Sequence, residues 1–165
     1  MSTQTVFNID EHEATCFFSK IFTAEVSAVW KGFAEQELLD QWWAPAPWKA
    51  QTLKHSFTDG GTWHYAMKGP EGEEHFAGVD YNEINENRSI SLTDYFTDEA
   101  GTVSTDLPVA EWLIGFTGVA DGTKLTVNFH FKSVEEMNRI LDMGFKDGFL
   151  TGMEQLEQLI AQQKR

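Results

Sequence analysis

The feature that most constrains the fold is a series of turn signals between Ala50 and Phe131. Short breaks rich in Gly, Asp, Asn and Pro separate extended runs of β-branched and aromatic residues. The breaks are Asp59-Gly60-Gly61, Gly69-Pro70-Glu71-Gly72, Asn85-Glu86-Asn87, a longer stretch from Asp98 to Pro108, and Asp121-Gly122. Because strands joined by short turns pair with their neighbours in antiparallel fashion, the pattern predicts a meander of six strands.

Before the meander, the sequence predicts one strand and two short helices. Thr15 to Phe22 is typical of a strand, and Thr23 is suited to cap the helix that follows. That helix would place Val26, Val29, Trp30 and Phe33 on one face. A second helix from Glu35 to Trp43 would end before Pro45 and Pro47, because proline disfavours helix at the residue before it.

After the meander, the sequence predicts a long amphipathic helix. The segment from Ser133 to Gln163 carries apolar residues at helical spacing, with a start or kink between Gly144 and Gly148. About 20 helical residues span roughly 30 Å, enough to cross a whole sheet.

This order of elements predicts an α+β fold of the helix-grip type. A curved antiparallel sheet of six to seven strands would wrap around the long C-terminal helix, with two short helices after the first strand. We assign residues 1–14 to an N-terminal arm and residues 15–165 to a single domain, because a chain of 165 residues holds one hydrophobic core.

Composition excludes several classes of partner. The 12 Lys and Arg residues against 26 Asp and Glu residues give a net charge of -14, which repels nucleic acid. The N-terminus lacks a signal-peptide pattern, and no stretch approaches the ~20 apolar residues of a membrane span. Cys16 is the single cysteine, and we expect it to be packed rather than nucleophilic. These features predict a cytoplasmic protein without membrane insertion.

Neither a metal nor a cofactor is expected. The five histidines show no metal-ligand spacing, although His64 and His75 would be diagonal neighbours on the outer face of the sheet. There is no nucleophile elbow, and Gly60-Gly61 fits a hairpin better than a phosphate-binding loop.

Four motifs, taken in order, resemble those of a known family. They are Val29-Trp30, Trp42-Trp43-Ala44-Pro45, Gly60-Gly61-Thr62-Trp63, and Gly148-Phe149 leading into Leu156. Over Cys16 to Ala161 the chain resembles the heat-shock-protein ATPase activator homologue family of the START-like superfamily. It departs from many relatives in having Phe149 in place of a tryptophan, and in a longer loop from Asp98 to Pro108.

The resemblance implies a cavity between the sheet and the long helix, which holds lipids, sterols, aromatic polyketides or hormones across the superfamily. The family name also implies a chaperone partner. The well-described activators resemble two-domain proteins, however, so we do not expect chaperone activation from a chain of 165 residues.

Strand register indicates which side chains face such a cavity. A hairpin at Gly69–Gly72 with Lys68 opposite Glu73 would place Tyr65 opposite Phe76 and Trp63 opposite Gly78. Trp63, Tyr65, Met67 and Phe76 would then face inward. A three-residue loop at 59–61 would also turn His55 inward, opposite Tyr65, whereas a two-residue turn would send it outward. Asp80 would face inward too, unless a bulge near Gly78 brings Val79 and Tyr81 round, which we favour because an unpaired buried carboxylate is costly.

Many large rings for one small domain either line a cavity or fill it, and the sequence does not decide between these. We expect a small apolar or aromatic molecule as ligand. The residues expected to contact it are Trp42, Trp43, His55, Trp63, Tyr65, Met67, Phe76, Tyr95, Trp112, Phe116, Phe145 and Phe149.

Three classes of function compete. A binding module requires only the pocket, and the sequence favours it over the others. A cyclase- or hydrolase-like enzyme would need His55, Asp80 or Tyr95 to converge as acid and base. A protein-interaction adaptor would use an exposed Trp42-Trp43 pair as its anchor. Unpaired sheet edges would also allow a homodimer.

Overall fold

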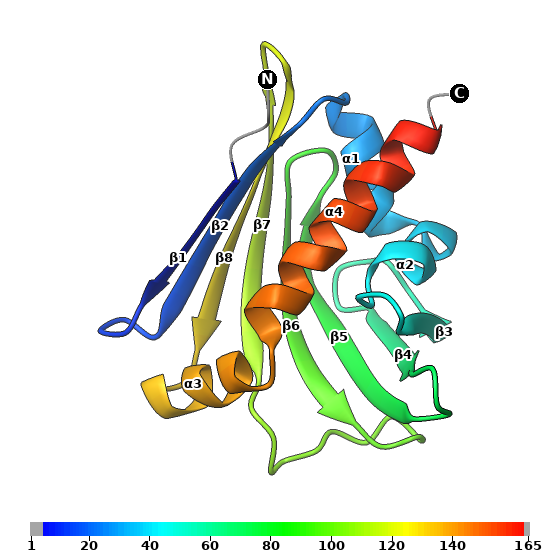
Figure 1. Ribbon diagram of the computed structural model, residues 1–165, viewed down its shortest axis with the longest axis vertical. Helices are drawn as coiled ribbons and strands as arrows, with labels where there is room; N and C mark the ends of the chain where they lie inside the picture. The colour runs from blue at the N-terminus through cyan, green and yellow to red at the C-terminus, as the bar shows by residue number, and fades with distance from the viewer. Residues whose placement is uncertain (1–4, 164–165) are drawn as a thin grey trace.

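The computed structural model describes residues 5–163, which form one antiparallel sheet of eight strands and four helices (Figure 1). The strand order across the sheet is β1-β2-β8-β7-β6-β5-β4-β3. The strands are β1 (Thr5–Asp10), β2 (Thr15–Phe22), β3 (Lys49–His55), β4 (Thr62–Lys68), β5 (Glu74–Asn85), β6 (Ser89–Thr97), β7 (Ala110–Val119) and β8 (Gly122–Phe131). The helices are α1 (Val26–Ala34), α2 (Gln36–Trp42), α3 (Val134–Asp142) and α4 (Phe145–Gln163).

The predicted fold class is confirmed, with one strand more than expected. Six strands, β3 to β8, form the meander. The additional strand is β1, which lies in the segment that we assigned to an arm and pairs with β2 from Thr5 opposite Lys20 to Asp10 opposite Thr15. The Asp10 carboxylate closes this hairpin, because it accepts hydrogen bonds from the backbone N–H groups of His12 and Glu13.

The helix boundaries differ from the prediction at their starts. Helix α1 begins at Val26 with Glu25 at its N-cap position, so Thr23 is not the cap. The expected long helix after Ser133 is two helices. Gly144, at φ 88°, adopts the left-handed conformation that stops α3 and lets α4 begin at Phe145.

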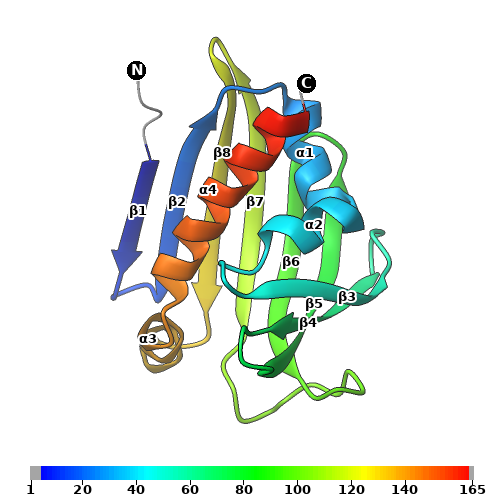
Figure 2. The ribbon, with the colours of Figure 1, turned by 45° about the vertical axis from the view of Figure 1, so that its right-hand side comes forward.

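Helix α4 crosses the concave face of the sheet diagonally, with α1 and α2 beside it at one end and α3 at the other (Figures 1 and 2). Its 19 residues give a length of about 28 Å. No helix within residues 5–163 is long and apolar enough to span a membrane.

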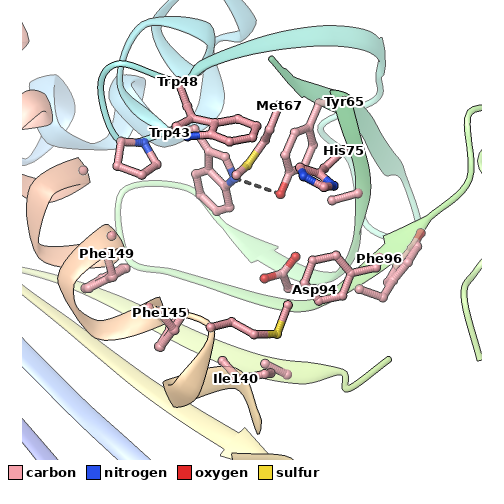
Figure 3. A pocket seen from close by; sticks show the side chains of 18 of the residues that line it. Trp43, Trp48, Tyr65, Met67, His75, Asp94, Phe96, Ile140, Phe145 and Phe149 are labelled. Atoms are coloured by element: carbon pink, nitrogen blue, oxygen red, sulfur yellow. Dashed lines mark hydrogen bonds between the residues drawn. The ribbon is translucent and has the colours of Figure 1, made fainter. Parts of the chain in front are cut away.

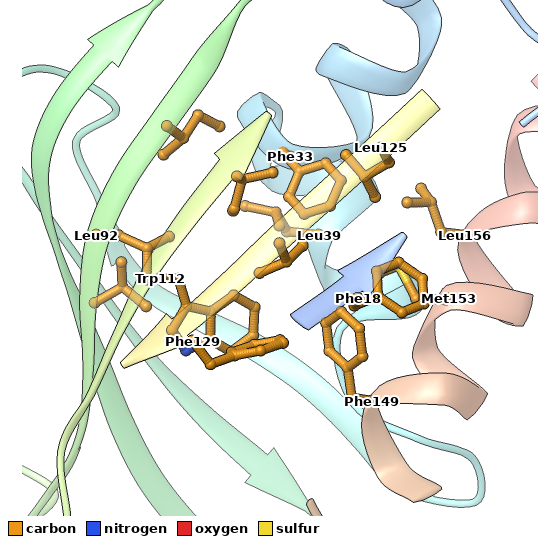
Figure 4. Packing of buried hydrophobic residues seen from close by; sticks show 14 of the residues in the cluster. Phe18, Phe33, Leu39, Leu92, Trp112, Leu125, Phe129, Phe149, Met153 and Leu156 are labelled. Atoms are coloured by element: carbon orange, nitrogen blue, oxygen red, sulfur yellow. The ribbon is translucent and has the colours of Figure 1, made fainter. Parts of the chain in front are cut away.

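The core lies between the concave face and these helices (Figure 4). Alternate residues of β8, Leu125, Val127 and Phe129, are fully buried, as their spacing predicts. Met153 and Leu156 of α4 pack in the same cluster. Burying each such side chain contributes about 1.5–3 kcal/mol to folding.

The cysteine lies in this core. Cys16 is buried in β2, and burial raises the pKa of its thiol to about 11. The thiol therefore stays protonated at neutral pH, which agrees with the prediction of a packed rather than a nucleophilic cysteine.

The register of the β4–β5 hairpin differs from the prediction by one residue. Lys68 lies opposite Glu74, because the connecting loop includes Glu73, whose carbonyl accepts a hydrogen bond from the N–H of Gly69. A shift of one residue turns every side chain of β5 to the other face. Phe76 and Gly78 therefore face outward, and His75 faces the concave side, contrary to our prediction.

The same shift resolves the positions of Asp80 and its neighbours. Val79 and Tyr81 are buried in the core without a bulge at Gly78, and the irregularity in β5 comes later, after Tyr81. Asp80 is exposed on the outer face, where its carboxylate accepts hydrogen bonds from the hydroxyls of Thr62 and Tyr95.

The β3–β4 connection is also longer than expected. His55 lies opposite Trp63 rather than opposite Tyr65, and a bulge between Thr52 and Lys54 changes the alternation along β3. The His55 ring packs against Trp63 and Tyr81, so it lies on the concave side.

Candidate functional site

A pocket of about 470 Å³ opens between the concave face of the sheet, the loop after α2 and the start of α4 (Figure 3). Strands β4 to β7 each contribute side chains to one wall, including Tyr65, Met67, His75, Ala77, Asp94, Phe96, Ala110 and Trp112. The facing wall comes from the loop after α2 and from α3 and α4, including Trp43, Pro45, Trp48, Ile140, Phe145, Gly148, Phe149 and Gly152.

Eight of the twelve residues selected from the sequence lie at this pocket. They are Trp42, Trp43, Tyr65, Met67, Tyr95, Trp112, Phe145 and Phe149. Tyr95 belongs to its edge, because its ring packs over Gly78 on the outer face, where its hydroxyl donates a 2.6 Å hydrogen bond to Asp80.

The other four residues lie away from the pocket. Phe76 faces outward beside His64, and Phe116 packs against Trp30 and Phe33 in the core. His55 and Trp63 are on the concave side but behind the wall that Tyr65 forms.

Trp63 supports this wall from behind. Its ring stacks on Tyr65 at 4.3 Å between centroids, and its indole N–H donates to the hydroxyl of Thr52. The Thr52 hydroxyl in turn donates to the Asp40 carboxylate at 2.6 Å. This chain of hydrogen bonds joins β4, β3 and α2, and it fixes the orientation of the Tyr65 ring.

Trp43 is the centre of the aromatic lining. It stacks on Trp112 at 5.4 Å with an interplanar angle of 21°, and its indole N–H donates a 2.8 Å hydrogen bond to the Tyr65 hydroxyl. Across the pocket, Phe145 and Phe149 stack at 6.0 Å on successive turns of α4. These rings give the pocket a largely apolar surface with defined ring orientations.

The loop after α2 is tied to α4 by one side chain. The Gln155 amide donates to the carbonyls of Trp42 and Ala44, both at 2.9 Å, and accepts from the N–H of Ala46 at 2.8 Å. Because all three bonds end on the backbone between Trp42 and Ala46, Gln155 holds this segment against α4 within the wall that faces the sheet.

Asp94 and Trp112 in the pocket each carry a polar group that has no partner in the described part of the chain. The Asp94 carboxylate makes no hydrogen bond or ion pair within the described residues, and burial raises its pKa to about 7. The indole N–H of Trp112 is buried, and it has no hydrogen-bond partner among residues 5–163.

Asp94, His75 and Trp48 are pocket residues that our prediction missed. The alternation of β6 contains the signal for Asp94, because Leu92, Asp94 and Phe96 share one face. His75 follows from the register once Glu73 is counted in the loop. Trp48, which stacks on His75 at 5.4 Å, gives no comparable signal because it lies in irregular chain.

The residues considered for acid–base catalysis do not converge. Asp80 and Tyr95 pair on the outer face of the sheet, while the His55 ring lies on the concave side within 3.1 Å of the Tyr81 hydroxyl. Burial lowers the pKa of His55. The Trp42-Trp43 pair is not an exposed anchor either, since Trp42 is buried and Trp43 faces the pocket.

The expected proximity of His64 and His75 is wrong as well. His64 hydrogen-bonds Thr97 on the outer face, whereas His75 lines the pocket. Within residues 5–163, no three His, Cys, Asp or Glu side chains are grouped closely enough to hold a metal ion.

Comparisons with known structures support the resemblance seen in the sequence. The chain is similar to the crystal structure of a Mycobacterium smegmatis protein, with a TM-score of 0.86 and 29% identity over 94% of this chain and 96% of the other. It is also similar to the solution structure of an Arthrobacter aurescens protein, with a TM-score of 0.90 and 26% identity over 95% and 91% of the two chains. A search of curated proteins returns no match.

The family model for activator of Hsp90 ATPase homolog 1-like protein matches residues 23–161, from the end of β2 almost to the end of α4. This segment contains all the residues that line the pocket. The chain therefore belongs to the activator of Hsp90 ATPase homolog 1-like family.

Proposed function

We propose that the protein binds a small apolar or aromatic molecule in the pocket between the sheet and α4. The observation that carries the proposal is an open volume of about 470 Å³ that is lined largely by aromatic side chains. Sites for small molecules typically have volumes of about 300–1,000 Å³ and surfaces of this kind.

Small residues keep this volume open. Gly148 and Gly152 lie one turn apart on the face of α4 that is turned to the pocket, and Ala77 and Ala110 lie on the sheet. A Cβ atom added to Gly148 would meet only Pro45, at 3.6 Å, which is ordinary van der Waals contact. A glycine inside a helix costs about 0.5–1 kcal/mol relative to alanine, and no close contact requires it at position 148.

The walls are held in place without a ligand. Gln155 ties the loop after α2 to α4, and the Trp43–Tyr65 hydrogen bond ties the end of α2 to β4. A preformed pocket binds more tightly than one that a ligand must order, because little conformational entropy is lost on binding.

A matched pair of variants at Gly148 tests the proposal. The probe is N-phenyl-1-naphthylamine, a neutral aromatic dye that fluoresces strongly in apolar sites. We expect Gly148→Ala to bind the dye like the native protein, and Gly148→Leu, whose side chain would extend into the pocket, to bind at least about tenfold more weakly. Circular dichroism would show whether both variants keep the native fold.

Two results of these measurements would count against the proposal. If native protein and both variants bind the dye equally, the dye lies elsewhere. If the native protein binds neither the dye nor any lipid or aromatic compound in a thermal-shift screen, the pocket is not a ligand site.

We also propose a cytoplasmic location, supported by the single buried thiol of Cys16. We further propose that residues 15–165 form one domain, to which β1 adds an edge strand. The edge strands β1 and β3 leave room for a homodimer through strand pairing. Light scattering during size-exclusion chromatography would measure the dimer directly.

A further inference from the structure

One carboxylate in the pocket lacks a partner. Asp94 lies on the concave face of β6, between Leu92 and Phe96 on the same face. In Figure 3 its carboxylate points into the open space between Tyr65 and Trp43 on one side and Phe145 and Ile140 on the other. Within the described residues it makes neither a hydrogen bond nor an ion pair. Asp94 is half-buried, and a carboxylate that faces an apolar pocket without a partner favours a ligand group that pairs with it.

The rest of the lining restricts what that group can be. Among residues 5–163, no Lys or Arg lines the pocket, so an anionic ligand next to Asp94 would meet no permanently charged cation there. The neighbouring surface consists of aromatic rings, with Trp43 stacked on Trp112 and Phe145 stacked on Phe149. The faces of such rings attract cations, and a net charge of -14 adds a favourable long-range field.

We infer that the ligand of this pocket carries a protonated or quaternary amine, which pairs with the Asp94 carboxylate while its apolar body lies among the aromatic rings. This inference rests on the proposed function and specifies its ligand class. An organic cation supplies a charge opposite to that of Asp94, whereas a neutral ligand can donate a hydrogen bond but leaves the negative charge uncompensated, and an anion would be repelled.

The protonation state of Asp94 sets the conditions of the test. Burial raises the pKa of this carboxyl to about 7, and the other titratable groups near it are Tyr65, Tyr95 and His75. At pH 8 the Asp94 carboxyl is mostly ionised, and an alkylamine is still protonated.

Three compounds with one aromatic body separate charge from shape. They are 1-naphthylmethylamine, 1-naphthylmethanol and 1-naphthylacetate, which are a cation, a neutral molecule and an anion at pH 8. Isothermal titration calorimetry with the native protein should show the amine binding at least about tenfold more tightly than the alcohol, and the acetate most weakly. In Asp94→Asn the advantage of the amine should fall at least about tenfold, while the alcohol keeps its affinity to within about threefold.

Glu111→Gln provides the matched control, because Glu111 is exposed on β7 and its substitution removes the same charge outside the pocket. This variant should keep the preference for the amine. Binding of the alcohol also reports whether Asp94→Asn keeps a folded pocket.

The possible results separate the two proposals. If the alcohol binds the native protein and the amine has no advantage, the amine inference is wrong and the proposed function stands. If the amine preference survives in Asp94→Asn, the cation lies elsewhere and the inference is wrong. If none of the three compounds binds the native protein, the amine inference is wrong, and the dye titration and the thermal-shift screen decide the proposed function separately.

Discussion

The indole N–H of Trp43 donates a 2.8 Å hydrogen bond to the hydroxyl of Tyr65, which joins the residue that caps α2 to the middle of β4. The two rings also meet edge to face, at 6.1 Å between centroids. Each ring has a second partner, because Trp43 stacks on Trp112 and Tyr65 stacks on Trp63. The bond therefore connects two aromatic stacks and sets the width of the pocket between helix and sheet.

Removing the Tyr65 hydroxyl should loosen this connection. In Tyr65→Phe the ring stack on Trp63 remains, but the half-buried Trp43 N–H loses its acceptor, so we expect a loss of about 1 kcal/mol in the free energy of unfolding. Urea denaturation measures this loss. A double-mutant cycle with Trp43→Phe isolates the bond, and the two single losses would add without coupling if the hydrogen bond contributed nothing.

Gln155 should matter more for the pocket than its place on the surface of α4 suggests. Gln155→Leu removes three hydrogen bonds to the backbone of the end of α2 and the loop after it, and we expect it to lower the free energy of unfolding by about 1–3 kcal/mol. Amide hydrogen exchange at Ala46 should also become faster, because its N–H would lose its acceptor.

Gln158→Leu is the control, because Gln158 is exposed on the same helix and the chemical change is identical. It should leave both measurements near their native values. Equal losses in the two variants would show that the effect comes from helix surface rather than from the loop contacts.

Most of the fold follows from the sequence, because strand alternation and turn residues are local signals. Leu125, Val127 and Phe129 alternate with polar residues and are buried together, and Gly144 marks the break between α3 and α4. Strand β1 was missed because Thr5–Asp10 is mostly exposed and lacks a continuous apolar face. The strand conformation of Thr5–Asp10 depends on its pairing with β2, which its own sequence does not indicate.

The candidate site was less predictable, because one residue of loop length decides which side chains face the pocket. Including Glu73 in the loop exchanges Phe76 for His75 on the concave side. Loop length depends on backbone conformation, here with Gly72 at φ 88°, and several turn geometries fit the same four residues. The alternation along β6 predicts that Asp94 faces the concave side, but an acidic residue is not typical of an apolar pocket.

A glycine on the outer face tests the corrected register. Gly78 lies under the Tyr95 ring, and an added Cβ atom would approach Tyr95 Cε1 to 2.6 Å. Gly78→Ala should therefore displace the ring, weaken the bond from Tyr95 to Asp80, and lower the free energy of unfolding by about 1–3 kcal/mol.

The corrected register also predicts that the effects of substitutions at Gly78 and Tyr95 depend on each other. In a Tyr95→Ser background the ring is absent, so the additional effect of Gly78→Ala should be much smaller. Chemical denaturation of the four proteins gives this coupling. An equal loss in both backgrounds would show that Gly78 is not covered by Tyr95.

Asp94 should make the protein less stable as the pH rises. Its pKa is about 7 in the folded protein, against 3.8 for an ordinary aspartate, because burial disfavours the charged form. Between about pH 4 and pH 7 the folded protein therefore holds a proton that the unfolded chain has released. The stabilisation from this group is complete below pH 4, declines through that window, and is absent above it.

Asp94→Asn removes this dependence, because an amide does not titrate. The variant should match the native protein near pH 4 and exceed it at pH 8 by about 1–3 kcal/mol, a range reduced from the full pKa shift because the pocket admits some solvent. Urea denaturation of both proteins from pH 4 to pH 8 measures the difference, in which the titration of other carboxylates cancels. A difference that stays constant across this range would mean that Asp94 is not buried as described. A saturating amine ligand should reduce the excess stability of the variant at pH 8, because it pairs with the ionised carboxylate of the native protein alone.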